Sequence, residues 1–240
     1  LTKDLRYSHT NEALADMNGI PVTQHLGRTL YDIVPDLAPK IEEAFRAVLE
    51  SGESLSLELK GETLKHPGVT RYWHEEIYRV DNTSGETLGL GVMVQEITGR
   101  KREELNAQLL LELSATTRFL NSPDDIEYTV VKTLGDYLNA SNCNFTKVDV
   151  EAATVTVAQQ WNTAGAKDFV GNYKLGDFVL PELMIDYQAG RTVAVDDVGQ
   201  DPRTLPYKEN FANLGIVAIL TVPYLEEGVW TGTLVVSCHT

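Results

Sequence analysis

Residues 88–101 read LGLGVMVQEITGRK, from Leu88 to Lys101, and this stretch decides how the chain is interpreted. Apolar side chains alternate with small or polar ones up to Gln95, which is the period of a half-buried strand. Within a few residues the pattern becomes that of a charged helix, with Arg100 and Lys101 near its start. A strand that enters a helix with almost no loop indicates a mechanical connection between a sheet and that helix.

The composition predicts a folded protein of two domains. The 240 residues are enough for two hydrophobic cores, and 42% hydrophobic with 23% charged residues is ordinary for a globular chain. The 35 acidic and 20 basic residues give a net charge of -15. This charge disfavours contact with phosphate backbones and anionic membrane surfaces, so nucleic acid is not expected as a partner.

The chain ends and the cysteines suggest where the protein resides. No apolar run approaches the roughly 18 to 20 residues of a membrane helix, and the N-terminus lacks a signal pattern, so we expect a cytoplasmic segment without membrane contact. Cys143 and Cys238 are far apart and lack ligand spacing, which predicts neither a disulfide nor a zinc site. Leu1 is not an initiator methionine and Thr240 closes a strand-like run, so we expect a fragment of a longer protein.

The first hundred residues predict an α+β domain with an antiparallel sheet. Expected helices cover residues 11–18 and 39–50, after a short start at 5–7. Expected strands cover residues 55–59, 71–80 and 87–95, with a hairpin turn at 81–85.

A long helix is expected from Thr98 to Leu120, where no proline occurs and no glycine follows Gly99. Its apolar residues repeat at helical spacing, which leaves two interpretations open: the helix covers a domain core, or it forms a dimer seam. The stripe consists of Leu105, Leu109, Leu113 and Leu120, broadened by Leu110 and Leu111.

The second half predicts another α+β domain. Expected helices run from about 123 to 138, from 181 to 188 and near 207–213. Expected strands cover 144–150, 154–161, 192–195, 216–224 and 230–237, the last two joined by a turn at Glu226-Glu227-Gly228.

Three stretches of the first domain, taken in their order along the chain, carry a family resemblance. Residues 11–19 read NEALADMNG, residues 26–35 read LGRTLYDIVP, and residues 96–101 read EITGRK. Together they resemble a PAS domain, covering about Leu1 to Lys101, whose last strand exits into a signalling helix. The resemblance implies that the family's first strand is missing or clipped at Leu1, and that Glu96, Ile97 and Thr98 relay the signal.

Four stretches of the second half resemble a GAF domain of the kind found in bacterial sensor kinases and phytochromes. Residues 173–178 read YKLGDF, 190–198 read GRTVAVDDV, 214–223 read LGIVAILTVP and 228–237 read GVWTGTLVVS. The resemblance covers about Leu105 to Thr240. The expected division is a PAS domain at 1–101, a connecting signalling helix at 102–122 and a GAF domain at 123–240 that lacks its C-terminal helix.

The two resemblances imply a sensory region of a bacterial signal-transduction protein. The parent is expected to be a two-component sensor histidine kinase, with the output domain downstream in the same polypeptide and a homodimer formed through the connecting helix. The chain itself shows no catalytic site. The alternative is a ligand-free dimerisation module that controls another output, such as a cyclic-dinucleotide enzyme or a transcription regulator.

No cofactor is predicted. The first domain has no cysteine for a flavin adduct, and its helix at 39–50 has no histidine for haem. Covalent bilin attachment in GAF domains uses a Cys-His pair, and the counterparts here are Tyr207 and Lys208; Cys238-His239 does not match the attachment site. The acidic residues Asp196, Asp197 and Asp201 predict a solvated loop and no metal site.

A small-molecule pocket of aromatic and acidic residues is the remaining candidate site. The spacing of these residues fits the sheet and lid segments that enclose ligand in the resembled GAF proteins, while core filling stays the open alternative. The candidates are Trp161, Tyr173, Asp177, Phe178, Tyr207 and Phe211.

Overall fold

The computed structural model describes residues 1–179 and 181–239, which fold into two compact units, Leu1–Asn106 and Ala107–Thr240. Each unit contains an antiparallel sheet with flanking helices, so the α+β class is confirmed. None of the helices in the described ranges is long and apolar enough to cross a membrane.

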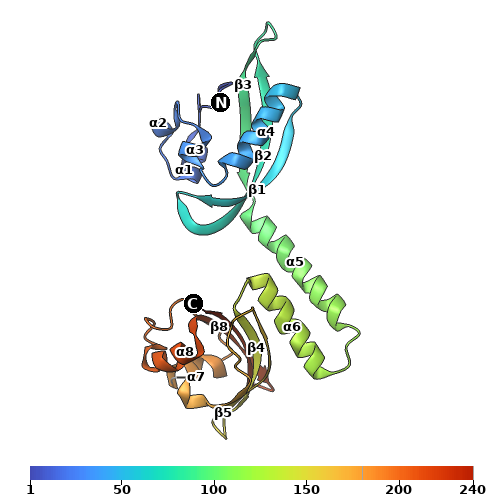
Figure 1. Cartoon of the computed structure of the whole chain (residues 1–240), viewed down its shortest axis with the longest axis vertical. Coiled ribbons are helices and arrows are strands. Elements are labelled where there is room, and N and C mark those ends of the chain that lie inside the picture. Colours follow the sequence, from blue (N-terminus) through green and yellow to red (C-terminus); the bar gives the residue numbers. More distant parts are fainter. Residues whose placement is uncertain (180, 240) are drawn as a thin grey trace. The chain divides into compact units, whose positions relative to one another are not determined.

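The first unit is built on a three-stranded sheet of order β1-β2-β3 (Figure 1). The strands are β1 (Leu55–Thr63), β2 (His66–Asp81) and β3 (Thr87–Glu96), each longer than expected. In β2 the alternate residues Trp73 and Ile77 are buried, because a pleated strand sends every second side chain to the core. The adjoining Asn82 accepts hydrogen bonds from the backbone of Ser84 and Glu86, which closes the β2–β3 turn.

Four helices accompany this sheet: α1 (Glu12–Asn18), α2 (Val22–His25), α3 (Leu30–Ile33) and α4 (Ala38–Ser51). Helix α4 buries Ile41, Phe45 and Val48 on one stripe and ends where Gly52 adopts a φ of 77°. The four-residue helices α2 and α3 were not expected from the sequence, because so short an element shows no helical period. The expected start at 5–7 forms only an isolated bridge between Arg6 and Thr29.

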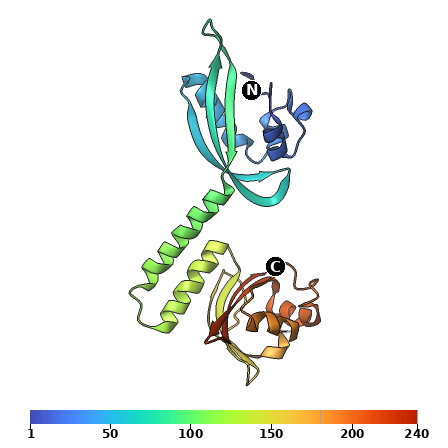
Figure 2. The ribbon, with the colours of Figure 1, turned by 180° about the vertical axis from the view of Figure 1, so that it is seen from behind.

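Helix α5 (Thr98–Thr117) follows β3 directly, as the sequence predicts, and ends three residues before Leu120. Its stripe residues Leu105, Leu109 and Leu113 are half-buried, whereas Leu110 and Leu111 are 66% and 70% exposed. Helix α6 (Pro123–Leu138) runs back alongside the second half of α5 in both views (Figures 1 and 2). Helix α5 therefore has one half-buried apolar stripe and one exposed apolar patch.

The second unit contains a six-stranded antiparallel sheet of order β6-β5-β4-β9-β8-β7. Its first four strands by sequence are β4 (Asn142–Asp149), β5 (Thr154–Asn162), β6 (Gly171–Lys174) and β7 (Val193–Val195). Strands β8 (Ile216–Glu226) and β9 (Val229–His239) are joined by Glu227 and Gly228, both with positive φ, as a tight hairpin turn requires. The four-residue strand β6 was not expected from the sequence.

The two faces of this sheet are covered differently. Helix α6 covers one face, where Gly135 lets the helix approach Trp161 and where Cys143 and Val236 are buried. The other face is covered by short helices that surround a second cluster (Figure 2). Strand β4 serves both layers: Cys143 and Phe145 point to α6, and Asn144 belongs to the opposite side. The short helices are η1 (Leu175–Asp177), α7 (Pro181–Gln188), η2 (Leu205–Tyr207) and α8 (Lys208–Leu214).

Candidate functional site

A cavity of about 130 Å³ lies in the second unit, between the sheet and the short helices that cover it. Its wall is mostly apolar, so an occupant would be held by shape and by removal of apolar surface from water. Six aromatic residues contribute to the wall, from β6, β9, helices α7 and α8, the segment before β6 and the residue after η1. They are Phe169, Tyr173, Phe178, Tyr187, Phe211 and Trp230.

A row of three aromatic rings spans the cavity's helical side. The Tyr173 and Phe178 rings lie 5.8 Å apart, and the Phe178 and Phe211 rings 5.6 Å apart, both in edge-to-face arrangements. The row is held in place because the Tyr173 hydroxyl donates to the Phe169 carbonyl at 2.8 Å and Asn210 of α8 donates to the η1 carbonyl of residue 177 at 2.6 Å. The Asn210 bond ties α8 to η1, and the Tyr173 bond ties β6 to the segment before it.

The sheet side of the cavity carries a few polar groups. The Tyr187 hydroxyl lies 2.9 Å from Thr221 Oγ1, and burial raises the pKa of this hydroxyl, which keeps it neutral. Asn144 is 2% exposed and donates to Asn142 Oδ1 at 2.7 Å. Within the described part of the chain, Asn144 Oδ1 accepts no hydrogen bond. One residue of the cavity wall therefore carries a buried acceptor without a hydrogen-bond partner, which is energetically costly.

The structure brings together three of the six residues proposed from the sequence. Tyr173, Phe178 and Phe211 line the cavity. Tyr207 packs against the same cluster without lining the cavity, and Asp177 is exposed.

Trp161 lies on the opposite face, against Gly135 of α6. A β-bulge explains this position. Val157 faces the cavity, and strict alternation would place Trp161 on the same side, but the register of β4 and β5 shifts between Phe145 and Thr146.

Among the aromatic and amide-bearing lining residues, the sequence reasoning missed Asn144, Phe169, Tyr187 and Trp230. Trp230 stands in the strand pattern of residues 229–239, and its indole donates to Gly232 O and Thr233 Oγ1, both at 2.9 Å. The alternation of the strand predicts the face of the sheet on which Trp230 lies. It does not predict which face lines a cavity.

The strand-to-helix junction brings the proposed relay residues Glu96, Ile97 and Thr98 together against β2. Both carboxylate oxygens of Glu96 accept from Arg71 Nη1, at 2.8 and 2.9 Å. Thr98 Oγ1 donates to Glu96 Oε1 at 2.8 Å and accepts from the Tyr72 amide at 3.0 Å, while the Ile97 amide donates to the Tyr72 carbonyl at 2.9 Å. The start of α5 is thus bonded to the middle strand.

The outer strand β1 also contacts the start of α5. Glu58 pairs with Lys101 at 3.0 Å and with Arg100 at 3.1 Å, and Lys101 pairs with Glu104 at 3.1 Å. The hydrogen bond from Lys101 lowers the pKa of the Glu58 carboxyl and raises the pKa of Lys101. Two of the three strands of the sheet therefore hold the first turn of the helix.

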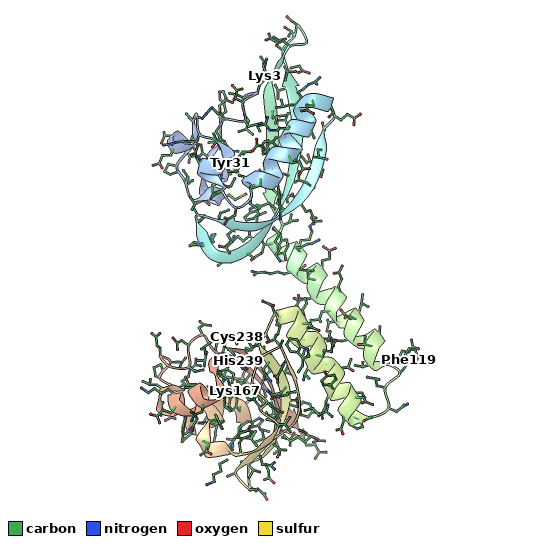
Figure 3. The ribbon with its side chains drawn as sticks, in the orientation of Figure 1. Lys3, Tyr31, Phe119, Lys167, Cys238 and His239 are labelled. Carbon is green, nitrogen blue, oxygen red and sulfur yellow. The ribbon has the colours of Figure 1, made fainter. Side chains whose placement is uncertain are left out.

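The acidic residues near Asp197 interact within their own loop. Asp197 accepts from the Gly199 amide at 2.8 Å and Asp201 pairs with Arg203 at 2.6 Å, so these carboxylates stabilise their own loop. Among the described residues no group of three potential metal ligands occurs. Cys143 is buried and Cys238 is exposed, and both are free thiols. Figure 3 labels Cys238 and His239 at the end of β9.

Comparison with known proteins agrees with this geometry. Residues 1–102 match the family model of the PAS fold, and residues 122–240 match that of the GAF domain. A search of curated proteins finds no match.

Several solved structures are similar to the chain at low identity. The chromophore-binding domain of Stigmatella aurantiaca bacteriophytochrome, as a point mutant in the Pr state, is 15% identical, with 97% of this chain and 81% of that chain covered and a TM-score of 0.50. The phycocyanobilin-bound GAF domain of a cyanobacterial phytochrome is 14% identical, with 55% and 79% covered and a TM-score of 0.49. The GAF domain of a phosphoenolpyruvate-protein phosphotransferase from Coxiella burnetii is 17% identical, with 55% and 77% covered and a TM-score of 0.45.

The two α+β units and the two family matches together place the chain among tandem PAS-GAF sensory domains. The chain carries a PAS fold followed by a GAF domain, as its sequence resemblances imply. At 15% identity and a TM-score of 0.50, the bacteriophytochrome structure supports the fold alone.

Proposed function

We propose that the chain is the sensory region of a bacterial two-component histidine kinase, in which the GAF cavity binds a small molecule and the connecting helix relays the change. The observation that carries this proposal is the 130 Å³ cavity with an apolar wall and a buried, unpaired acceptor at Asn144. Cores that only fill space contain few cavities of this size and few unpaired buried acceptors. The relay is proposed to act at Glu96, Ile97 and Thr98, and the domains are proposed to span 1–101, 102–122 and 123–240.

The cavity size restricts the class of ligand. An engineered apolar cavity of about 150 Å³ holds one benzene molecule, so 130 Å³ suits a single small ring. Drug-sized and larger ligands occupy pockets of about 300–1,000 Å³. We therefore propose a small aromatic ligand with one hydrogen-bond donor, such as a phenol, and no covalently bound bilin. No flavin-cysteine adduct is proposed for the PAS domain.

Phenol is the probe that tests this site. Thermal unfolding of the chain is followed with phenol and, separately, with benzene at equal concentration. Filling the cavity by Val235→Phe should abolish the stabilisation by phenol, while Val222→Phe on the opposite face of the sheet should keep it. Equal stabilisation of the Val235→Phe variant, or no stabilisation of the unmodified chain, would refute a phenol-sized ligand site in this cavity.

The homodimer is proposed to form through the open patch of α5. Leu110 and Leu111 are 66% and 70% exposed, and Phe119 just beyond the helix is 79% exposed (Figure 3). Leu111→Glu should lower the sedimentation coefficient to that of a monomer, while Ile185→Glu, at an equally open position of α7, should not. An unchanged sedimentation profile for Leu111→Glu would refute a dimer interface at this patch of α5.

The same exposed patch favours the second candidate, a ligand-free dimerisation module controlling a different output. Two measurements distinguish the two candidates. Mass spectrometry of small molecules released from the denatured chain, together with the phenol titration, yields an occupant for a sensor and none for a module that only dimerises.

A further inference from the structure

A carboxyl group occupies a core position in the sheet of the PAS domain. Glu75 lies in β2 between Trp73 and Ile77, on the same face, and is only 6% exposed. The residues directly opposite Glu75 in the neighbouring strands are Leu57 and Val94. A carboxyl group surrounded in this way loses its hydration, and buried charges in proteins are normally paired to offset that loss.

Glu75 has no such partner in the described ranges 1–179 and 181–239. No group there donates a hydrogen bond to Glu75 Oε2, and Thr63 Oγ1, in a residue that is also 6% exposed, has no hydrogen bond either. Both residues line a cavity of about 80 Å³, which α1 and α4 also line. Most of the remaining wall is apolar, with Phe45 and Trp73 among its largest side chains. Two unpaired polar atoms thus belong to one small, largely apolar cavity.

The charges around the cavity favour a positive occupant. Among the described lining residues there is no lysine or arginine. The titratable groups besides Glu75 are the Tyr7 and His9 side chains and the amino group of Leu1, which donates to the Leu90 carbonyl at 2.9 Å. Burial raises the pKa of the Glu75 carboxyl to about 7. Burial, and then the charge of Glu75, raises the pKa of the Tyr7 hydroxyl. A cation within a few ångströms would favour the carboxylate, whereas an anion would meet repulsion.

We propose that the PAS cavity binds a small organic ammonium ion whose charged nitrogen pairs with Glu75. An ammonium group donates up to three hydrogen bonds, so Thr63 Oγ1 can accept a second one. The alkyl part lies against the apolar wall near Phe45 and Trp73. Because a single water occupies about 10–15 Å³ on this measure, a cavity of 80 Å³ holds only a few heavy atoms. This site is separate from the GAF cavity and does not depend on its occupant.

Isothermal titration with ethylammonium chloride at pH 7.5 tests the pairing. The unmodified chain should bind ethylammonium, and Glu75→Gln should weaken the affinity at least about tenfold, because a hydrogen bond to a charged group is lost. Glu76→Gln is the matched control, since Glu76 is the next residue of β2 and is exposed on the other face. Ethanol and sodium propionate should bind far more weakly. Equal binding by Glu75→Gln, or equal binding of ethanol, overturns the proposal.

A second measurement needs no substitution and so does not depend on whether Glu75→Gln folds. At pH 6 the carboxyl of Glu75 is largely protonated, so pairing with ethylammonium should release up to one proton to the buffer. Titrations in two buffers of different ionisation enthalpy count this proton. The release should fall towards zero at pH 8.5. Binding at pH 6 without proton release, or no binding of ethylammonium at all, contradicts the site.

Discussion

The buried carboxyl of Glu75 predicts how the stability of the PAS domain depends on pH. Its pKa in the folded chain is about 7, against an ordinary value of 4.5. Because the folded pKa is the higher one, folding favours the protonated form. The stability that this provides is fully present below about pH 4.5 and is lost as the pH rises through 7.

The size of the effect follows from the two pKa values. At about 1.4 kcal/mol for each pH unit, the interval from 4.5 to about 7 corresponds to about 3 kcal/mol, of which about 2 to 3 kcal/mol falls between pH 5 and 8. Replacing Glu75 by glutamine removes this titration. The free energy of unfolding of the unmodified domain should therefore fall by about 2 to 3 kcal/mol more than that of Glu75→Gln over this range.

Urea denaturation at several pH values measures the difference, with the indole N–H signal of Trp73 in NMR spectra as the probe. The chain has three tryptophans, so this signal can be assigned by substitution, and Trp73 lies two residues from Glu75 on the same face. The other titratable groups of the cavity, which are Tyr7, His9 and the amino group of Leu1, are present in both proteins and cancel in the comparison. Glu76→Gln should follow the unmodified chain. Parallel stability curves for Glu75→Gln and the unmodified chain refute the reasoning, because they mean that Glu75 titrates normally.

Three further predictions concern packing, the junction and thiol chemistry. Gly135→Ala places a Cβ 2.1 Å from Trp161, and this clash should destabilise the GAF domain by about 1–3 kcal/mol in denaturant titrations. Glu96→Gln weakens the bonds that hold the start of α5 and should cost about 1 kcal/mol locally, seen as faster hydrogen exchange of the first helical amides. Cys238 should react quickly with a thiol reagent and Cys143 only on unfolding, because burial raises the pKa of Cys143 to about 12.

Each of these predictions has a control and an outcome that contradicts it. Gly176→Ala, whose Cβ meets nothing within 4 Å, should leave stability nearly unchanged, and an equal loss in both glycine variants would show that packing is not the cause. Arg71→Gln should reproduce the faster exchange of Glu96→Gln, and unchanged exchange in both argues against the junction bonds. Two thiols that react at the same rate in the folded chain contradict the burial of Cys143.

The sequence predicts the long elements because their periods are long enough to count. The strands of the PAS sheet and helices α4 to α7 were expected near their observed bounds, since each shows several repeats of its period. Elements of four residues, such as Val22–His25 and Gly171–Lys174, carry no countable period and depend on tertiary packing. The two family resemblances rest on several motifs in a fixed order, so they hold even where a short element is not predicted.

The candidate site was only half predictable, for a physical reason. Tyr173, Phe178 and Phe211 were found because their segments lie next to the covering helices. The face of Trp161 depends on a bulge between Phe145 and Thr146, and no local pattern reveals an extra residue in a strand. Alternation places Glu75 in the core, but only the structure shows that the acid lines a cavity without a partner.

Strand β4 contributes side chains to both packing layers of the GAF domain, so binding in the cavity would affect the layer under α6 as well. Asn144 lines the cavity, and its neighbours Cys143 and Phe145 press on the layer beneath α6. The pleat places adjacent side chains on opposite faces of the strand. A rotation of β4 that makes room for a ligand beside Asn144 would therefore move Cys143 and Phe145 the other way and shift the packing under α6. A larger ligand would therefore shift the packing under α6 further than a smaller ligand.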